Sequence, residues 1–314
     1  MKKKTPLIWC LAGPTAAGKS GLCESIAQYL PVEIINVDSA TIYRTMDIGT
    51  AKPGAREQQA LKHHLLDILD PSQSYSVARF CEDAQRLIRE IQSRDHIPLL
   101  VGGTMMYFNA LQKGLSDLPG AHPEVRAEIE QQALTQGWPA MHQTLAGIDP
   151  VTAARLAPND SQRIARALEV HTITGQPLSS LIGAGTASQA MPNLRMISLE
   201  PSDRGALHRR IEQRFDSMLE QGFLQEVERL HARGDLHQDL PSIRCVGYRQ
   251  LWDVVAQGES IEHAREKAII ATRQLAKRQL TWLRSMPDRI AVDCLSQDMR
   301  DTVRKILQHS FEQG

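Results

Sequence analysis

A glycine-rich loop near the start of the chain constrains the possible fold more than any other feature. Residues 13–20 read GPTAAGKS and match the pattern GxxxxGK(S/T) at every position. Glycines let such a loop turn several backbone N–H groups toward one phosphate cluster, and the lysine adds a full positive charge. The apolar run 6–11 precedes the loop and a predicted helix at 21–30 follows it. The sequence therefore predicts a strand, a phosphate-binding loop and a helix.

The loop predicts a diphosphate or triphosphate ligand without saying which. The residues predicted to bind it are Gly13, Pro14, Thr15, Ala16, Ala17, Gly18, Lys19 and Ser20. The Ser20 hydroxyl is the predicted Mg²⁺ ligand. A nucleotide hydrolase normally adds an Asp at the end of an apolar strand, but the run 97–101 ends in Gly-Gly. The nearest acidic candidate is Asp67.

Other apolar runs indicate a parallel sheet. Strands are expected at 31–37, 97–101, 194–199 and 289–292, and helices at 77–94, 204–233 and 261–284. Strands that alternate with helices predict an α/β fold with helices on the faces of the sheet, here a P-loop NTPase-like core. Ligands gather at the carboxyl ends of such strands, where Gly13, Asp38 and Gly102 fall.

The pattern changes between 113 and 193, where helical stretches are broken by Pro, Gly and Ser and no clear strand is visible. We interpret 113–193 as a helical insertion domain. The flanking parts, 1–112 and 194–314, then form the catalytic core.

Composition limits the class of protein but not its partner. Hydrophobic residues make up 42% of the 314 residues and charged residues 23%, as in a globular protein with a proper core. No apolar run is long enough to cross a bilayer, so we expect a cytoplasmic protein without a membrane partner. We separately expect a monomer. The 36 basic and 36 acidic residues balance, so any nucleic-acid surface must be local. Five scattered cysteines argue against a disulfide framework or a zinc site.

Asp38 follows an apolar strand at the ligand edge of the predicted sheet. A carboxylate there suits a general base, a metal ligand or a helix cap, and its position alone does not choose among them.

Arginines and lysines recur at helical spacing in three places. Arg210 and Arg214 lie four apart, and a guanidinium fork suits a pair of diphosphate oxygens. Between 264 and 284 there are six basic residues and one acid, with Arg273, Lys277 and Arg284 on one helical face. Arg163 and Arg166 form a basic edge in the insertion. Each set suits phosphate contacts, although a solvated helix face explains such patterns equally well.

Several longer segments together resemble one known family. They are 38–40 (DSA), 42–44 (IYR), 46–53 (MDIGTAKP), 64–67 (HLLD), 75–77 (YSV), 101–104 (VGGT), 162–170 (QRIARALEV), 244–249 (RCVGYR) and 277–284 (KRQLTWLR). With the loop at 13–20 they run in order through most of the chain. They look like the signature of the tRNA dimethylallyltransferase family, bacterial type.

The resemblance implies an enzyme that transfers a dimethylallyl group from dimethylallyl diphosphate. The acceptor is the exocyclic amine of the adenosine immediately 3′ to the anticodon in tRNA. It implies a catalytic set of Asp38, Thr104 and Arg214, Mg²⁺ as cofactor, and an insertion that grips the anticodon stem-loop. The residues it assigns to tRNA are Asp38, Ser39, Ala40, Thr41, Thr104, Arg126, Gln162, Arg163, Ile164, Ala165, Arg166, Arg244, Cys245, Val246, Gly247, Tyr248, Arg249, Lys277, Arg278, Gln279, Leu280, Thr281, Trp282, Leu283 and Arg284.

Three other functions compete with this interpretation. One is a P-loop kinase that uses ATP on a small molecule or nucleotide, which the missing strand-end Asp disfavours. Another is a prenyltransferase that acts on free adenine nucleotides, which the insertion and its arginines disfavour. The third is an RNA-binding protein without catalysis, which Asp38 and the complete loop disfavour.

Overall fold

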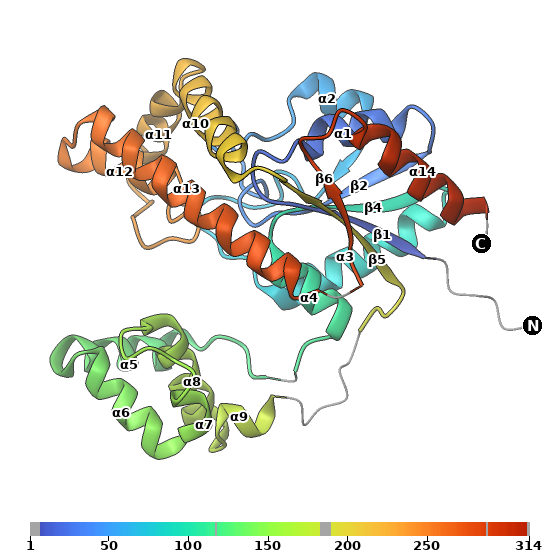
Figure 1. Cartoon of the computed structure of the whole chain (residues 1–314). Coiled ribbons are helices and arrows are strands. Elements are labelled where there is room, and N and C mark those ends of the chain that lie inside the picture. Colours follow the sequence, from blue (N-terminus) through green and yellow to red (C-terminus); the bar gives the residue numbers. More distant parts are fainter. Residues whose placement is uncertain (1–6, 117, 183–189, 287, 313–314) are drawn as a thin grey trace, which may run out of the picture. The chain divides into compact units, whose positions relative to one another are not determined.

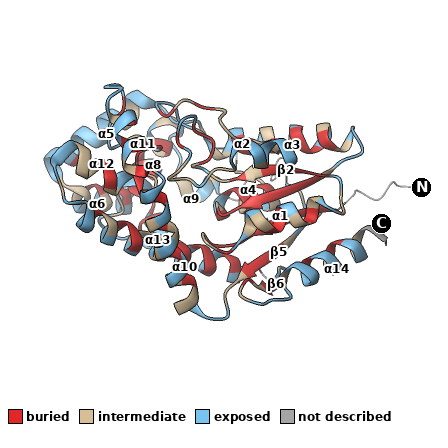
Figure 2. Ribbon diagram, turned by 90° about the horizontal axis from the view of Figure 1, so that it is seen from above, coloured by how far each residue is buried: buried red, intermediate tan, exposed pale blue. Residues whose placement is uncertain are grey.

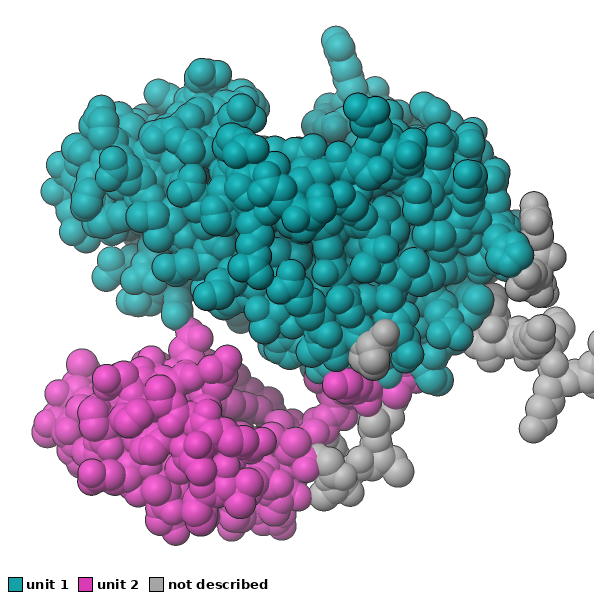
Figure 3. All heavy atoms as spheres, viewed as in Figure 1, with its two compact units in different colours: residues 1–112, 192–314 teal, residues 113–191 magenta. Residues whose placement is uncertain are grey.

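The computed structural model describes residues 7–116, 118–182, 190–286 and 288–312. By their internal contacts, these residues divide into two compact units (Figure 3). Unit 1 comprises residues 1–112 and 192–314, and unit 2 comprises residues 113–191. Unit 2 thus begins at the residue expected for the insertion and ends two residues before the expected 193.

Unit 1 is built on a six-stranded sheet in the order β3-β2-β4-β1-β5-β6, and every neighbouring pair is parallel. The strands are β1 Ile8–Ala12, β2 Val32–Val37, β3 His63–His64, β4 Ile97–Gly102, β5 Leu194–Glu200 and β6 Ile290–Asp293. This arrangement confirms the predicted P-loop NTPase-like α/β fold. Only the short edge strand β3 was missed, because two residues give no periodic signal.

Helices cover both faces of the sheet, which is why the central strands read as apolar runs. Helix α1 (Lys19–Ala27) and helix α14 (Met299–Glu312) lie on one side, and α3 (Val77–Gln92) and α4 (Met105–Lys113) lie on the other (Figure 1). All five residues of β1 are buried. Trp9 and Leu11 pack with Leu22 and Ile26 of α1 and with Val303 of α14. Figure 2 shows the central strands buried and the outer sides of the covering helices exposed.

A second apolar cluster holds a group of helices beyond the sheet. Its helices are α10 (Arg204–Glu220), α11 (Phe223–His231), α12 (Tyr248–Gln257) and α13 (Ile261–Arg284). The short helix α2 (Ala55–Ala60) lies outside this cluster but also belongs to unit 1. Phe215, Phe223 and Tyr248 pack there against Ile42 and Met46. Because the cluster includes the segment 42–46, it anchors the chain that follows β2.

The single helix expected at 204–233 is wrong, because the structure has two. Helix α10 begins after Asp203, whose carboxylate caps it by accepting from the N–H groups of Gly205 and Ala206. The chain then turns at Gly222, whose φ of 96° is in the left-handed region that glycine tolerates. The periodic apolar residues continue across this break, so periodicity alone does not reveal it.

Unit 2 is helical, with α5 (Pro123–Gln136), α6 (Trp138–Ile148), α7 (Pro150–Ala153), α8 (Ser161–Thr174) and α9 (Leu178–Leu181). Ile129 of α5, Met141 and Leu145 of α6, and Ile164 and Leu168 of α8 form its own core. None of the helices described in either unit is both long and apolar enough to span a bilayer.

Candidate functional site

The glycine-rich loop joins β1 to α1 and has the backbone of a phosphate cradle. Gly18 has φ 84° and leads into the first turn of α1, and Ala16 has φ 63°. Lys19 Nζ lies over the loop and donates to the carbonyl oxygens of Gly13 and Pro14, both at 2.9 Å. An ammonium group, a helix N-terminus and turned N–H groups in one place form a site for a phosphate cluster.

Asp38 lies at the carboxyl end of β2, beside the end of β4. Its Oδ1 accepts from the N–H of Ala40 at 2.8 Å, as in a turn cap. Its Oδ2 accepts no hydrogen bond from any described residue, so one oxygen holds the turn and the other is available for a proton. Thr104 Oγ1 accepts from the N–H of Ser39 at 3.1 Å. Thr104 therefore orients the turn that carries Asp38.

The ends of β2 and β4 approach closely because of a glycine. A Cβ on Gly102 would lie 2.0 Å from the carbonyl oxygen of Val37, so no larger residue fits there. The N–H groups of Gly103 and Thr104 both donate to that same carbonyl oxygen, at 3.2 and 3.1 Å. These contacts fix Asp38 and Thr104 relative to each other.

Charged groups converge on Asp38 from separate elements. Burial lowers the pKa of Lys19 to about 8, and the charge of Asp38 limits that fall. Burial likewise lowers the pKa of the Arg214 guanidinium on α10, again opposed by Asp38. Burial, and then Asp38, raise the pKa of the Cys245 thiol to about 12. Lys19 of the loop, Arg214 of α10 and Cys245 thus lie within electrostatic range of the Asp38 carboxylate. Arg214 makes no hydrogen bond or ion pair with a described residue.

The protein offers few ligands for a metal ion. Ser20 is exposed in the first turn of α1, and among the residues that the structure describes no three His, Cys, Asp or Glu side chains cluster. Asp67, the acidic candidate, accepts from Lys52 Nζ at 2.6 Å. Mg²⁺ typically takes one or two protein ligands and fills the rest of its shell with phosphate oxygens and water. The exposed Ser20 hydroxyl therefore fits a Mg²⁺ ion that arrives with a diphosphate.

The residues assigned to tRNA by resemblance fall into two groups in the structure. The exposed or half-buried group comprises Asp38, Ser39, Ala40, Thr104, Arg126, Gln162, Arg163, Arg166, Arg244, Cys245, Val246, Arg249, Lys277, Arg278, Thr281, Trp282 and Arg284. The buried group comprises Thr41, Ile164, Ala165, Gly247, Tyr248, Gln279, Leu280 and Leu283.

Direct RNA contact stays a prediction for both groups, but the structure places the side chains of the buried group in the protein interior. The side chains of Ile164 and Leu283 are fully buried, Ala165 and Leu280 are 6% exposed, and Tyr248 is fully buried. Each motif contributes alternately to the surface and to the core because it lies on a helix or leads into one. The family resemblance matched each motif as a continuous segment. It therefore did not distinguish the residues that face solvent from those that face the core.

Some of the basic residues that the sequence suggests for phosphate contacts form ion pairs within the protein. Arg273 pairs with Glu212 at 3.1 Å, which partly neutralises its charge. In unit 2, Arg126 and Arg166 both donate to Oε2 of the fully buried Glu169, at 3.1 and 2.8 Å. On α13, Lys277 and Arg278 are exposed. Trp282, 43% exposed, adds an aromatic face next to them on the same helix.

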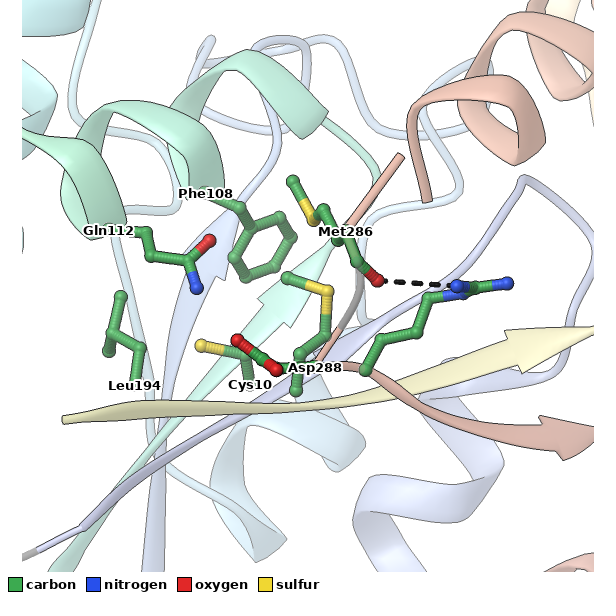
Figure 4. A pocket seen from close by; sticks show the side chains of 8 residues that line it. Cys10, Phe108, Gln112, Leu194, Met286 and Asp288 are labelled. Carbon is green, nitrogen blue, oxygen red and sulfur yellow. Dashed lines mark hydrogen bonds between the residues drawn. The ribbon is translucent and has the colours of Figure 1, made fainter. Parts of the chain in front are cut away.

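Among the described residues of unit 1, two pockets lie outside this cluster. One, of about 20 Å³, is lined by Phe108 and Gln112 of α4, by Cys10 and Leu194 of the sheet and by Met286 (Figure 4). It has room for about one water molecule, which is too small for a prenyl chain. The other, of about 480 Å³, lies between Asp47, Lys52 and the start of α2. Neither is lined by a residue of the glycine-rich loop.

Two structural residues were not recognised from the sequence. Glu226 is 3% exposed and accepts from the N–H groups of Asp47, Ile48 and Gly49. Lys52 Nζ donates to the carboxylates of Asp47 and Asp67, both at 2.6 Å. Glu226 lies at helical spacing among the apolar residues Phe223, Val227 and Leu230. A charged residue on an apolar helical stripe was therefore the sequence signal that could have revealed its buried role.

The site has three parts: a parallel sheet, a glycine-rich loop after β1 and the Asp38 carboxylate after β2. Together they define a P-loop protein with a group-transfer site. Comparison with known proteins places it more narrowly. The sequence profile of the IPP transferase family matches residues 41–286, and the chain belongs to this family.

Similar curated proteins cover nearly the whole chain. A tRNA dimethylallyltransferase of Bordetella petrii is 61% identical over 298 residues, which are 94% of this chain and 95% of that protein. A tRNA dimethylallyltransferase of Cupriavidus taiwanensis is 58% identical over 306 residues, 96% of this chain and 95% of that protein.

Solved structures agree with the fold. The full-length tRNA isopentenylpyrophosphate transferase of Bacillus halodurans superposes with a TM-score of 0.71 at 36% identity, covering 98% of each chain. A eukaryotic dimethylallyltransferase described as acting on tRNA gives a TM-score of 0.81 at 27% identity, covering 98% of this chain and 80% of that one. These relatives carry prenyl-transfer names, which supports the transferase interpretation over the kinase.

Proposed function

We propose that the chain is a tRNA dimethylallyltransferase. It transfers the dimethylallyl group of dimethylallyl diphosphate to the N6 amine of the adenosine 3′-adjacent to the anticodon, and it releases diphosphate. The observation that carries the proposal is geometric: the glycine-rich loop with Lys19 follows β1 and the Asp38 turn follows β2, and both strands pair with β4 in one parallel sheet. The names of the similar proteins support the same reaction.

The leaving group is held by the glycine-rich loop. As the allylic C–O bond breaks, positive charge develops on the allyl carbon and negative charge on the departing diphosphate. The turned N–H groups at 13–20, Lys19 and Arg214 stabilise that negative charge. A Mg²⁺ ion bound through Ser20 and the diphosphate oxygens would supply Lewis-acid assistance to the same departure.

Asp38 acts on the nucleophile. The N6 amine of adenine is a poor nucleophile because its lone pair is delocalised into the ring, and it becomes acidic as the N–C bond forms. The free Oδ2 of Asp38 accepts this proton, while Thr104 keeps the turn in place through Ser39. A positioned base of this kind contributes about 10²- to 10⁴-fold to the rate.

The RNA has to present one base to this edge. The target adenine is stacked in the anticodon loop, and extruding it costs a few kcal/mol, which backbone contacts must offset. The exposed cations Arg244, Arg249, Lys277 and Arg278 in unit 1 suit such contacts. In unit 2, Gln162, Arg163 and the pair Arg126 and Arg166 do the same for the stem-loop.

Prenyl transfer to unmodified tRNA tests the proposal. The protein is incubated with Mg²⁺, labelled dimethylallyl diphosphate and unmodified tRNA, and the digested nucleosides are separated. We expect label on the adenosine 3′ to the anticodon and one diphosphate released per transfer. Label on free AMP but not on tRNA would contradict the proposed acceptor. ATP consumption without prenyl transfer would indicate the kinase instead.

A further inference from the structure

Gln279 of α13 joins the glycine-rich loop to the end of β4. It is 9% exposed, and its side-chain amide uses both of its ends. Oε1 accepts from the N–H of Thr15 at 3.1 Å, and Nε2 donates to the carbonyl oxygen of Gly103 at 2.9 Å. One side chain therefore holds the two loops that follow β1 and β4.

Gly103 makes room for this amide. A Cβ at Gly103 would lie 2.5 Å from Nε2 of Gln279 and 3.4 Å from the carbonyl oxygen of Gly13. Since a real Cβ does not approach so closely, the bridge requires a glycine at the strand end. The two consecutive glycines after β4 thus have separate roles. Gly102 admits the end of β2, and Gly103 admits Gln279.

The helix gives no packing reason for an amide at this position. Ala276, Leu280 and Leu283 flank Gln279 on the buried stripe of α13, and all three are apolar. A methionine of similar length would fill the same space. What the amide adds is a fixed distance between two backbone segments, because both of its bonds have to be satisfied at once.

The two segments carry the two halves of the proposed reaction. Thr15 belongs to the loop that holds the diphosphate. Gly103 precedes Thr104, which orients the turn of Asp38. Transfer requires the allyl carbon and the amine nitrogen to meet at close range, and a misplacement of about 1 Å can cost about 10²-fold in rate.

We propose that Gln279 is a positioning residue that fixes the glycine-rich loop against the Asp38–Thr104 pair. The family resemblance assigned Gln279 to RNA contact, and in the structure its side chain bonds to the backbone of Thr15 and Gly103. Its helical neighbours Lys277 and Arg278 remain exposed. The inference rests on the proposed function, because it assigns the nucleophile and the leaving group to the two segments.

Gln279→Met tests this role, since methionine keeps the length and loses both hydrogen bonds. Gln274→Met on the exposed side of the same helix is the matched control. Single-turnover transfer, tRNA affinity and affinity for inorganic diphosphate are measured for each full-length variant. We expect Gln279→Met to slow transfer at saturating substrates by about 10- to 100-fold. Both affinities should change by less than about threefold, and Gln274→Met should match the wild type.

A second variant keeps the test decisive if Gln279→Met unfolds. Gln279→Glu retains an acceptor for Thr15 but loses the donor to Gly103 and, when ionised, adds a negative charge beside that carbonyl oxygen, so its rate should also fall well below that of wild type. A wild-type rate in either folded variant would overturn the proposal. So would a loss of tRNA affinity as large as the loss of rate, which would restore direct RNA contact. Absence of product from the wild type would instead contradict the proposed function.

Discussion

The hydroxyl of Tyr248 donates a hydrogen bond to Oε1 of Glu226 at 2.5 Å. The same carboxylate accepts three backbone N–H groups from residues 47–49, and no described cation pairs with it. Gly49 lets this segment approach, since a Cβ there would lie 2.1 Å from the Phe223 ring. Tyr248 and Glu226 therefore hold the segment after 46 against α11 and α12, which gives Tyr248 a structural task.

Tyr248→Phe should lower the free energy of unfolding by about 1.5–3 kcal/mol, because it removes a hydrogen bond to a buried charged group. Tyr29→Phe is the matched control, since the Tyr29 hydroxyl is buried without a hydrogen-bond partner. Its removal should leave stability unchanged or raise it slightly. Urea unfolding compares the two variants. Equal effects at both positions would contradict the role given to the Tyr248–Glu226 bond.

Much of the core could be predicted from local chemistry. The loop at 13–20 follows a pattern that few backbones satisfy, and buried parallel strands read as apolar runs because both of their faces are covered. Asp38 and Gly102 were placed at one edge for the same reason. The break at Gly222 was missed because α10 and α11 both present apolar residues to one core, so the periodicity continues through the turn.

The division of each motif between surface and core was harder to predict. In 277–284, Lys277, Arg278 and Trp282 are exposed while Gln279 and Leu280 are buried. A polar residue on the apolar stripe of a helix signals a buried partner. The partner itself, an N–H more than two hundred residues away in the chain, depends on tertiary structure that no local pattern contains.

The ionisation of Lys19 should limit donor binding at alkaline pH. Burial lowers its pKa to about 8 in the free protein, so above that pH the ammonium loses the charge that attracts a diphosphate. The ratio kcat/KM for dimethylallyl diphosphate should therefore fall as pH rises through about 8. The bound diphosphate favours the charged amine, so kcat should fall only at higher pH.

Lys19→Arg is the control for this pH effect, because a guanidinium stays charged throughout the range. Its activity should be lower at every pH, since the fork does not fit the ammonium position, and the alkaline fall should disappear. A wild-type profile of kcat/KM that stays flat to about pH 9.5 would contradict the assignment. The same fall in Lys19→Arg would show that another group titrates.

Glu169 should matter for RNA binding although it is buried. Burial tends to raise its pKa, but hydrogen bonds from Arg166 and from the N–H of His122, with the charge of Arg126, outweigh this and lower it. Glu169→Gln removes the negative charge that holds both arginines, so tRNA should bind several-fold more weakly. The salt dependence of binding should also flatten, by about 0.7–0.9 in log–log slope for each RNA phosphate that an arginine no longer neutralises.

Glu128→Gln, on the exposed side of α5, is the control for Glu169→Gln and should bind tRNA like the wild type. A double-mutant cycle with Arg126→Ala separates positioning from general destabilisation. If Glu169 acts through Arg126, its substitution should cost less affinity in the Arg126→Ala background. Fully additive losses would contradict this account of Glu169.

The direct test of the central claim is single-turnover transfer by Asp38→Asn. Asparagine keeps an oxygen for the Ala40 N–H and removes the base, so the turn should be retained. With saturating tRNA and dimethylallyl diphosphate, we predict a rate lower by about 10²- to 10⁴-fold and tRNA affinity within about threefold of wild type. A wild-type rate in this variant would contradict the assignment of Asp38 as the base that takes the proton from the adenosine amine.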